Sequence, residues 1–394
     1  MSVVRTELRE TQAAKRLNAG AHLTLKKRGV SSGRIVLHED AFVSMLYLER
    51  RRAERAQKPF VLMLVDVKNA IAIKDGQKTL TLGKVTKALL SVTRETDIVG
   101  WYLEDQLIGV IGTEVGNAKP KTVQGRMLEK VRAALVEALP TEKVSKITVS
   151  FHFFPEEEED GSTDHSANIT LYPDLSRQEE SRKFALGIKR SMDFVGSAAA
   201  LVLLAPVFAA VSLAIKFTSK GPVLFKQERL GQYGRKFTVL KFRSMRTDCD
   251  ARIHEEYVSQ FIAGQVIGTS QGSEPPVFKI QKDPRVTRFG RFLRRTSLDE
   301  LPQFWNVMVG DMSLVGPRPP LPYEFKAYDL WHRRRVLEIK PGITGLWQVK
   351  GRSRTRFDEM VRLDLKYARA WSIWLDVKIL LETPGAVLTG EGAH

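Results

Sequence analysis

The chain has 394 residues and a formal net charge of +17, and this charge is concentrated in its second half. Residues 181–394 contain 35 basic and 20 acidic side chains, whereas the first 180 residues are nearly balanced. The length allows two or three domains, and the basic half indicates an anionic partner, namely a nucleic acid, an anionic lipid or a phosphorylated substrate. The single cysteine, Cys249, excludes an intrachain disulfide and a cysteine-rich zinc site. Residues 1–33 form a polar, basic tail in which no secretory signal is expected.

A separate folding unit is predicted for residues 34–155. The expected order is a helix at residues 40–56, a buried strand at 60–67, a helix after that strand, a hairpin at 97–112, a further helix at 122–139 and a last strand at 147–154. This order predicts an α+β sandwich with a mixed or antiparallel sheet. The acidic and polar composition that follows predicts a linker over residues 156–181.

An uncharged apolar run of 22 residues extends from Phe194 to Ile215. As a helix it would be ~33 Å long, enough to cross a hydrocarbon core of ~30 Å. Ala205-Pro206 lies near its middle and predicts a bend, because proline removes a backbone hydrogen bond. Basic residues on both flanks favour a cytoplasmic location for both ends. We therefore expect a re-entrant membrane helix over residues 182–217, and a kinked span is the alternative.

A pair of adjacent carboxylates, Asp299-Glu300, lies between Arg294-Arg295 and a Gly-Pro-Arg-Pro turn at residues 316–319. A carboxylate that faces a phosphate is repelled unless cations intervene, and arginine forks or a divalent metal supply that neutralisation. The pattern predicts a site for phosphoryl transfer. An ordinary helix start with Ser297 as the cap is the alternative.

Three further features of the second half bear on this site. Lys241 and Arg243 end a strand-like run over residues 237–242. A polar segment over residues 251–276 is expected to be an irregular loop over the site. Two amphipathic stretches follow, in which Trp331, Trp371 and Trp374 alternate with basic residues over 324–339 and 357–381. Such stretches are typical of helices at a membrane interface, and helices of a protein core are the alternative.

Residues 34–155 resemble the GGDEF domains of diguanylate cyclases in their element order. The catalytic hairpin is degenerate, because residues 103–107 read Leu-Glu-Asp-Gln-Leu and lack both glycines. Asp66 matches the first metal carboxylate of that family, but Lys68 occupies the second acidic position. We therefore expect no cyclase activity.

One further match to this family lies before the hairpin. Arg94 and Asp97 have the spacing of the inhibitory RxxD site, so the resemblance implies a cyclic di-GMP site there. A surface pair of these residues, in a domain that serves packing or dimerisation, is the favoured alternative.

From about Lys183 to its end, the chain resembles the bacterial sugar transferases, which are polyprenyl-phosphate hexose-1-phosphate transferases. The blocks that match in order are KRSMDFVGS, GPVLFKQERLGQYGRKFTVLKFRSM, DPRVTRFGRFLRRTSLDELPQFWNVMVGDMSLVGPRP and KPGITGLWQVKGR. The resemblance implies a helix-rich monotopic catalytic domain, residues 218–394, on the cytoplasmic face of the bacterial inner membrane. It also implies transfer of a sugar 1-phosphate from a nucleoside diphosphate sugar, usually a UDP-sugar, to undecaprenyl phosphate, with release of UMP, at the start of surface glycan assembly.

The same resemblance implies the roles of the site residues. Asp299 matches the nucleophile, and Glu300 together with Asp299 would hold Mg²⁺. The expected phosphate-binding residues are Arg294, Arg318, Lys241, Arg243 and Pro319. No nucleic acid partner is expected, because the basic residues surround an apolar membrane helix. A membrane-anchored regulatory protein that senses a nucleotide and lacks transferase activity is the alternative function.

Overall fold

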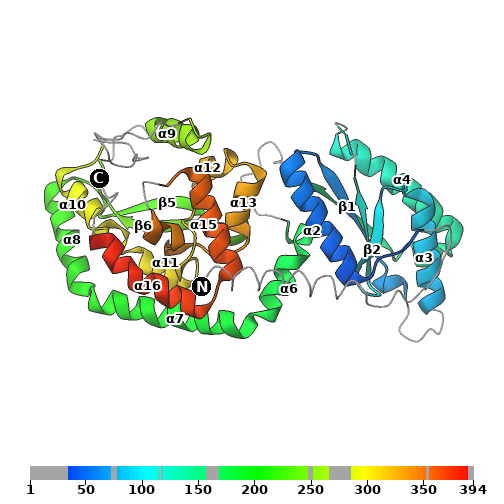
Figure 1. Ribbon diagram of the computed structural model, residues 1–394, viewed down its shortest axis with the longest axis horizontal. Helices are drawn as coiled ribbons and strands as arrows, with labels where there is room; N and C mark the ends of the chain where they lie inside the picture. Colours follow the sequence, from blue (N-terminus) through cyan, green and yellow to red (C-terminus); the bar gives the residue numbers. More distant parts are fainter. Residues whose placement is uncertain are drawn as a thin grey trace, which may run out of the picture. The chain divides into compact units, whose positions relative to one another are not determined.

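The computed structural model describes residues 34–71, 78–113, 115–116, 119–156, 168–246, 252–265, 285–351 and 355–388. These residues fold into two compact units of mixed helix and sheet (Figure 1). The first unit contains described residues up to 42, with 63–113 and 117–151, and the second contains 43–62, 114–116 and 152–394. The expected tail, residues 1–33, lies outside the described residues.

The division between the units differs from the boundary expected at residue 155. Most of helix α2 (Glu39–Ala56) is grouped with the second unit. Arg50 of this helix donates to the carbonyl of Leu171 and contacts Asp174 Oδ1 at 2.9 Å. The later part of the expected linker is also structured, as the 3-10 turn Ile169–Leu171 and helix α6 (Pro173–Ser181).

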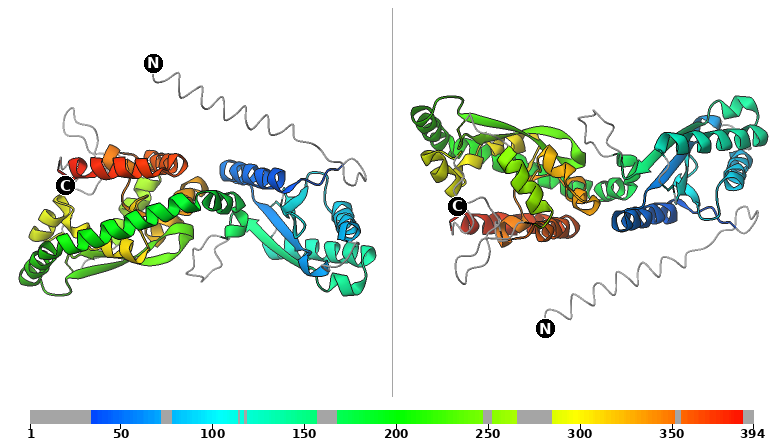
Figure 2. Two further views of the ribbon diagram at one scale, coloured as in Figure 1. Left: turned by 90° about the horizontal axis from the view of Figure 1, so that it is seen from below. Right: turned by 90° about the horizontal axis from the view of Figure 1, so that it is seen from above.

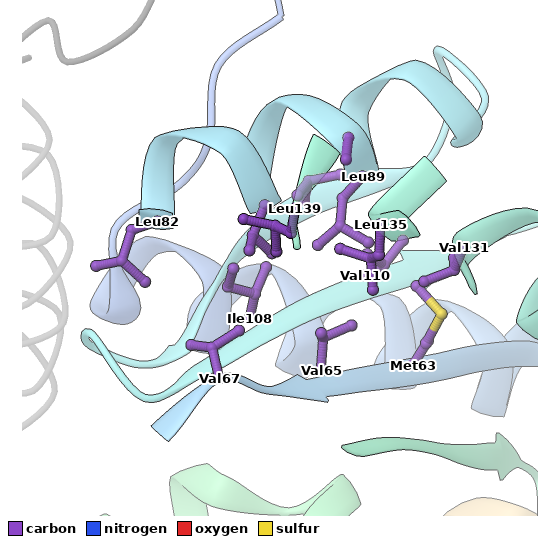
Figure 3. Close-up of a cluster of buried hydrophobic side chains, with 13 residues drawn as sticks. Met63, Val65, Val67, Leu82, Leu89, Ile108, Val110, Val131, Leu135 and Leu139 are labelled. Carbon is purple, nitrogen blue, oxygen red and sulfur yellow. The ribbon is translucent and has the colours of Figure 1, made fainter. Parts of the chain in front are cut away.

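A four-stranded sheet, most of whose residues belong to the first unit, has the order β2-β3-β1-β4. The strands are β1 (Phe60–Asp66), β2 (Ile98–Leu103), β3 (Leu107–Gly112) and β4 (Thr148–Phe154), and the helices are α3 (Lys78–Val92), α4 (Pro120–Ala138) and α5 (Thr141–Val144). Strands β2 and β3 form the predicted antiparallel hairpin. Helices α3 and α4 lie on the same side of the sheet (Figure 2), and their apolar side chains pack on Met63, Val65 and Ile108 (Figure 3). The predicted strands and helices of this unit are confirmed.

The apolar run of the second unit forms two helices, α7 (Lys183–Leu203) and α8 (Ala205–Thr218). They are bent by 60° at the break, which is visible in Figure 1. Pro206 lies in the first turn of α8, where a missing N–H group costs no hydrogen bond, so the predicted bend is confirmed. Within the described residues, no single helix is long and apolar enough to cross a membrane, whereas this bent pair passes that test of length and composition together.

The polar start of α7 is anchored by buried contacts. Lys189 Nζ lies 2.6 Å from Asp376 Oδ2 of α16 (Ile373–Leu388) and donates to the carbonyl of Val315. Arg190 donates to carbonyls at the end of α11 (Gln303–Val309). Asp193 accepts from the backbone N–H of Leu314 at 2.9 Å, in strand β7 (Ser313–Val315). The charged residues at the start of this helix thus dock it onto the rest of the second unit.

The second unit contains further helices and strands. They are β5 (Leu224–Leu230), β6 (Lys236–Phe242), α9 (Arg252–Ile262), α10 (Arg288–Arg295), α12 (Pro322–Lys326), α13 (Leu330–Leu337), β8 (Gly342–Thr344), α14 (Leu346–Lys350) and α15 (Phe357–Ala370). Strands β5 and β6 form an antiparallel hairpin, and β7 pairs with β8 in parallel. The strand predicted at residues 237–242 is confirmed.

Two expectations for the second unit need correction. The segment expected to be an irregular loop begins with helix α9, whose Phe261 and Ile262 pack into the core, and residues 266–276 lie outside the described residues. The interfacial interpretation of the amphipathic stretches fails for Trp331 and Trp371, because both pack in hydrophobic clusters. Trp374 alone of the three tryptophans is exposed. Helical spacing of Trp and Leu does not distinguish a core from a membrane interface.

Candidate active site

The two carboxylates lie in a short 3-10 turn, Leu298–Glu300, which connects α10 to α11. Ser297 precedes them with φ 57° and ψ 17°, a left-handed conformation that is uncommon for a residue other than glycine. Its side chain makes no capping hydrogen bond, so the ordinary helix start considered above is not what forms. Backbone strain of this kind often occurs where side chains must be held for function.

Glu300 is paired with a lysine from the end of strand β6. Its Oε1 lies 2.9 Å from Nζ of Lys241. Burial opposes ionisation of Glu300, but the charges of Lys241, Arg318 and Arg229 outweigh burial and hold the pKa of Glu300 below its usual value. This carboxylate is therefore ionised at neutral pH.

The pKa of Asp299 is shifted in the opposite direction to that of Glu300. Burial, followed by the negative charge of Glu300, raises the pKa of Asp299 to about 6, while Lys241 and Arg294 act against the rise. At neutral pH the group is still largely ionised, and its greater basicity makes it a better nucleophile than an ordinary aspartate. Perturbed pKa values of this kind cluster at functional sites.

Two arginines complete the set of charges. Arg294, in the last turn of α10, donates from Nε to Ser244 Oγ at 3.1 Å. Arg318 is exposed on the Gly-Pro-Arg-Pro turn and acts electrostatically on Glu300. The structure thus brings the charges of Asp299, Glu300, Lys241, Arg294 and Arg318 close to one another.

The Gly-Pro-Arg-Pro turn rests on the Lys-Pro-Gly-Ile-Thr-Gly segment through two glycines. A Cβ atom on Gly342 would lie 2.0 Å from the backbone nitrogen of Gly316, so no larger residue fits there. The N–H of Gly316 donates to Thr344 O at 2.8 Å, and the N–H of Gly342 donates to Pro317 O at 2.9 Å. Both Gly316 and Gly342 are needed for this close backbone contact, which holds the turn that contains Arg318.

Arg243 and Pro319, which were expected to bind phosphate, make structural contacts. Arg243 is buried, and its Nη2 donates to Ser219 O at 2.9 Å and to Ser219 Oγ at 2.7 Å, at the C-terminal end of α8. Pro319 is buried, and its carbonyl accepts from Arg229 Nη1 at 2.7 Å. Arg229 was not identified from the sequence, where an arginine at the end of a strand gives no signal of a buried contact.

The residues of the expected cyclic di-GMP site form a local turn. The side chain of Asp97 accepts from the backbone N–H of Arg94 at 2.8 Å, and Arg94 is exposed. At the degenerate hairpin, Asp105 has φ 58° and its Oδ2 lies 3.0 Å from Lys78 Nζ. Arg94 and Asp97 thus share one turn of the chain, and a cyclic di-GMP site there stays a prediction.

The chemistry of the carboxylate pair is suited to a hard divalent cation. Within the part of the chain that the structure describes, no group of three or more His, Cys, Asp or Glu side chains gathers to hold a metal ion. Mg²⁺ does not need such a group, because it is commonly bound by one or two carboxylates together with substrate phosphates. Asp299 and Glu300, whose mutual repulsion contributes to the raised pKa of Asp299, fit that pattern.

Known proteins resemble this chain chiefly in the unit that contains these residues. The N-terminal unit has a weak likeness to a solved diguanylate cyclase (DGC) protein from Thermotoga maritima, with 20% identity and a TM-score of 0.25 over 32% of this chain and 87% of that one. A score this low does not establish a shared fold, so the GGDEF-like description stays a prediction.

Stronger matches are found among sugar transferases. Galactosyl transferase CpsE of Streptococcus agalactiae is 45% identical over 207 residues, which cover 52% of this chain and 43% of that protein. The UDP-glucose:undecaprenyl-phosphate glucose-1-phosphate transferase of Escherichia coli is 40% identical over 208 residues, 50% of this chain and 39% of that protein. The chain thus spans less than half the length of these relatives.

A shorter relative is covered almost completely. Exopolysaccharide production protein ExoY of Rhizobium meliloti is 36% identical over 206 residues, which cover 52% of this chain and 88% of that protein. Residues 184–390, more than half of the chain, match the family model described as bacterial sugar transferase. These residues include the bent helix pair, the carboxylate pair and the Gly-Pro-Arg-Pro turn, and the chain therefore belongs to the bacterial sugar transferase family.

Proposed function

We propose that this protein transfers a sugar 1-phosphate from a UDP-sugar to undecaprenyl phosphate, as an early step of exopolysaccharide synthesis. The observation that carries the proposal is the setting of Asp299, whose pKa is raised to about 6 beside Glu300, with the cations Lys241 and Arg294 close by. A basic carboxylate among cations is suited to attack an anionic phosphorus centre. Relatives of this chain are named as galactose and glucose phosphotransferases that use undecaprenyl phosphate, which supports this substrate class.

In the proposed reaction, a carboxylate oxygen of Asp299 attacks the phosphorus atom that bears the sugar. The bond from that phosphorus to the oxygen bridging the two phosphates breaks, and UMP leaves. An oxygen of undecaprenyl phosphate then attacks the same phosphorus atom and releases the carboxylate of Asp299. Two displacements at one site let two bulky substrates react in turn.

The cations have separate tasks in this scheme. Lys241 holds Glu300 at 2.9 Å, and Arg294 and Arg318 would bind phosphate oxygens. We propose that Glu300, together with Asp299, holds Mg²⁺, which would neutralise charge on the substrate phosphates when bound. Arg243 would act mainly by tying the end of β6 to α8.

We also propose that the bent pair α7 and α8 enters the cytoplasmic leaflet of the inner membrane and returns. Large apolar side chains along the pair are exposed, including Phe184, Val202, Leu203 and Phe217. The 60° bend and the basic residues on both flanks support this placement. The N-terminal unit is proposed to serve packing or dimerisation, and binding of cyclic di-GMP at Arg94 and Asp97 is the second candidate.

The test of the proposed activity is a reaction with a panel of UDP-sugars, undecaprenyl phosphate and Mg²⁺. We expect a lipid-linked sugar diphosphate with at least one donor, and no product without Mg²⁺. Asp299→Asn should lower the rate at least about a hundredfold, or ~2.7 kcal/mol, because an amide keeps the shape and lacks the nucleophile. The matched control is Asp311→Asn, which changes an exposed aspartate of the same unit and should leave the rate unchanged. Full activity of Asp299→Asn would refute its role.

A further inference from the structure

The Gly-Pro-Arg-Pro turn depends on donors from other elements. Pro317, Pro319 and the following Pro320 have no backbone N–H, so this segment offers few donors of its own. Its carbonyls accept from outside: Pro320 O from the N–H of Leu230 at 2.9 Å, and Pro319 O from Arg229 Nη1 at 2.7 Å. The position of Arg318 is therefore set by strand β5 as much as by its own neighbours.

Arg335 also contacts the turn, at the backbone carbonyl of Arg318. Arg335 is buried, and its Nη2 lies 3.3 Å from Arg318 O and 2.7 Å from Asp364 Oδ2. The ion pair with Asp364 fixes the guanidinium that reaches the turn. Arg229 and Arg335 thus contact successive carbonyls of the same loop, at Pro319 and Arg318.

Arg229 differs from Arg335 in the kind of acceptors that its guanidinium contacts. Its Nε and Nη2 donate to Gln227 Oε1 at 3.1 and 2.8 Å, and its Nη1 donates to the Pro319 carbonyl. All three hydrogen bonds end on neutral oxygens, although the side chain is only 4% exposed. Burial and the nearby charge of Arg318 lower the pKa of Arg229 to about 10, so the group stays charged at neutral pH. Arg229 therefore places positive charge close to Arg318 and Glu300.

We propose that Arg229 is a positioning residue for the phosphate subsite: it holds the backbone of the Gly-Pro-Arg-Pro turn so that Arg318 faces the substrate diphosphate, and it adds its own positive charge behind that subsite. The inference rests on the proposed transferase function and deepens it, since it names the residue on which the arrangement of Arg318 depends. A purely structural arginine would stabilise the fold without a specific link to Arg318.

A double-mutant cycle tests that link. The variants are Arg229→Lys, Arg318→Met and the double variant, and the measurement is KM for the UDP-sugar in the full-length protein at saturating undecaprenyl phosphate. If Arg229 acts through Arg318, Arg229→Lys raises KM about tenfold in the wild-type background and less than about twofold in the Arg318→Met background. Arg229→Met, which also removes the charge, should raise KM further than Arg229→Lys.

The control variant is Lys236→Met, on the same β5–β6 hairpin. Lys236 Nζ lies 2.9 Å from Glu228 Oε1, and this ion pair does not involve the Gly-Pro-Arg-Pro turn. Lys236→Met should therefore leave KM unchanged. Thermal unfolding of each variant verifies that it is folded. The cycle itself uses Arg229→Lys, so it can still be measured if Arg229→Met does not fold. Equal increases of KM in both backgrounds would overturn the inference while leaving the proposed function intact. Absence of UMP release by the wild-type protein with every UDP-sugar would instead contradict the proposed function, and the inference with it.

Discussion

Asp299 and Glu300 are neighbours in the sequence, yet their surroundings shift their pKa values in opposite directions. Lys241 contacts Glu300 directly at 2.9 Å and favours its charged form, whereas Asp299 is half-buried beside the resulting negative charge. In the proposed mechanism, Glu300 is thereby held ionised for binding, and Asp299 is made more basic for attack. This division of roles between paired carboxylates is a recurrent means of setting acid and base strength.

The first prediction concerns the dependence of activity on pH. The nucleophile must be ionised, and the pKa of Asp299 is about 6, so kcat/KM should fall as the pH drops through about 6. Glu300→Gln removes the negative neighbour and should move this acid limb to lower pH. Lys241→Met removes a cation that favours ionisation and should move it to higher pH. Profiles measured for the three proteins would contradict the assignment if both variants shifted in the same direction.

The residues of the site differ in how far the sequence could reveal them. Asp299, Glu300, Arg294 and Arg318 lie in one stretch whose spacing predicted a phosphate site. Arg229 could not be found in this way, because its contact with Pro319 joins residues 90 positions apart. Short-range patterns report side chains of one turn or helix, whereas the supports of a loop come from distant parts of the chain.

At the scale of elements, the bent helix pair combines a predictable feature with one that depends on the fold. Proline inside an apolar run predicted the break, because its missing N–H interrupts the helical hydrogen bonds. The buried ion pair between Lys189 and Asp376 could not be predicted, since it joins α7 to a helix near the end of the chain. The same limit applies to α9, whose polar composition concealed an apolar face.

The second prediction tests the placement of this helix pair in the membrane. Cysteines at Lys183 and Lys220, both exposed and at the outer ends of the pair, should be labelled only from the cytoplasmic side in a background with Cys249→Ser. Pro206→Ala should move the pair towards a span, because a straight helix could then form the backbone hydrogen bond that a proline excludes. If either cysteine were labelled from the periplasm in the protein that retains Pro206, the pair would be shown to span the membrane.

The third prediction concerns the anchor of α7. Lys189→Met leaves Asp376, which is fully buried, without its cation, and should lower the free energy of unfolding by about 3–5 kcal/mol. Adding Asp376→Asn should recover part of the loss, because the carboxylate that lost its cation is then removed as well. Denaturant unfolding of the detergent-solubilised protein measures the change. The control Lys183→Met breaks an exposed pair with Glu180 and should have no measurable effect; equal effects of the two lysine variants would contradict the anchoring role.

At the scale of the whole molecule, the chain joins the first unit, with its four-stranded sheet, to the second unit, which carries the match to the bacterial sugar transferase family. The strands of the first unit could be predicted from apolar runs, but the grouping of α2 with the second unit could not. That grouping involves the contacts of Arg50 with Leu171 and Asp174, which lie more than a hundred residues away. Domain boundaries read from composition miss such contacts because composition reports only the local chain.

The fourth prediction is that the full-length protein forms no cyclic di-GMP from GTP and Mg²⁺. The hairpin carries Leu103 and Glu104 in place of the two glycines of the GGDEF motif. These side chains block the close approach of a nucleotide phosphate to the backbone of the hairpin. Chromatography of the reaction mixture measures the product. An active diguanylate cyclase run in parallel is the control, and detectable turnover by this protein would require a second activity to be assigned to the N-terminal unit.

The covalent role of Asp299 is tested most directly by incubating the protein with its UDP-sugar and Mg²⁺ in the absence of undecaprenyl phosphate. We predict that UMP appears in an amount equal to the enzyme and then stops, because each Asp299 reacts once and waits for the acceptor. Adding undecaprenyl phosphate should restart UMP release, and Asp299→Asn should show no initial release. If UMP appeared only after the acceptor was added, with turnover then at the normal rate, transfer would be direct and the account of Asp299 as nucleophile would be wrong.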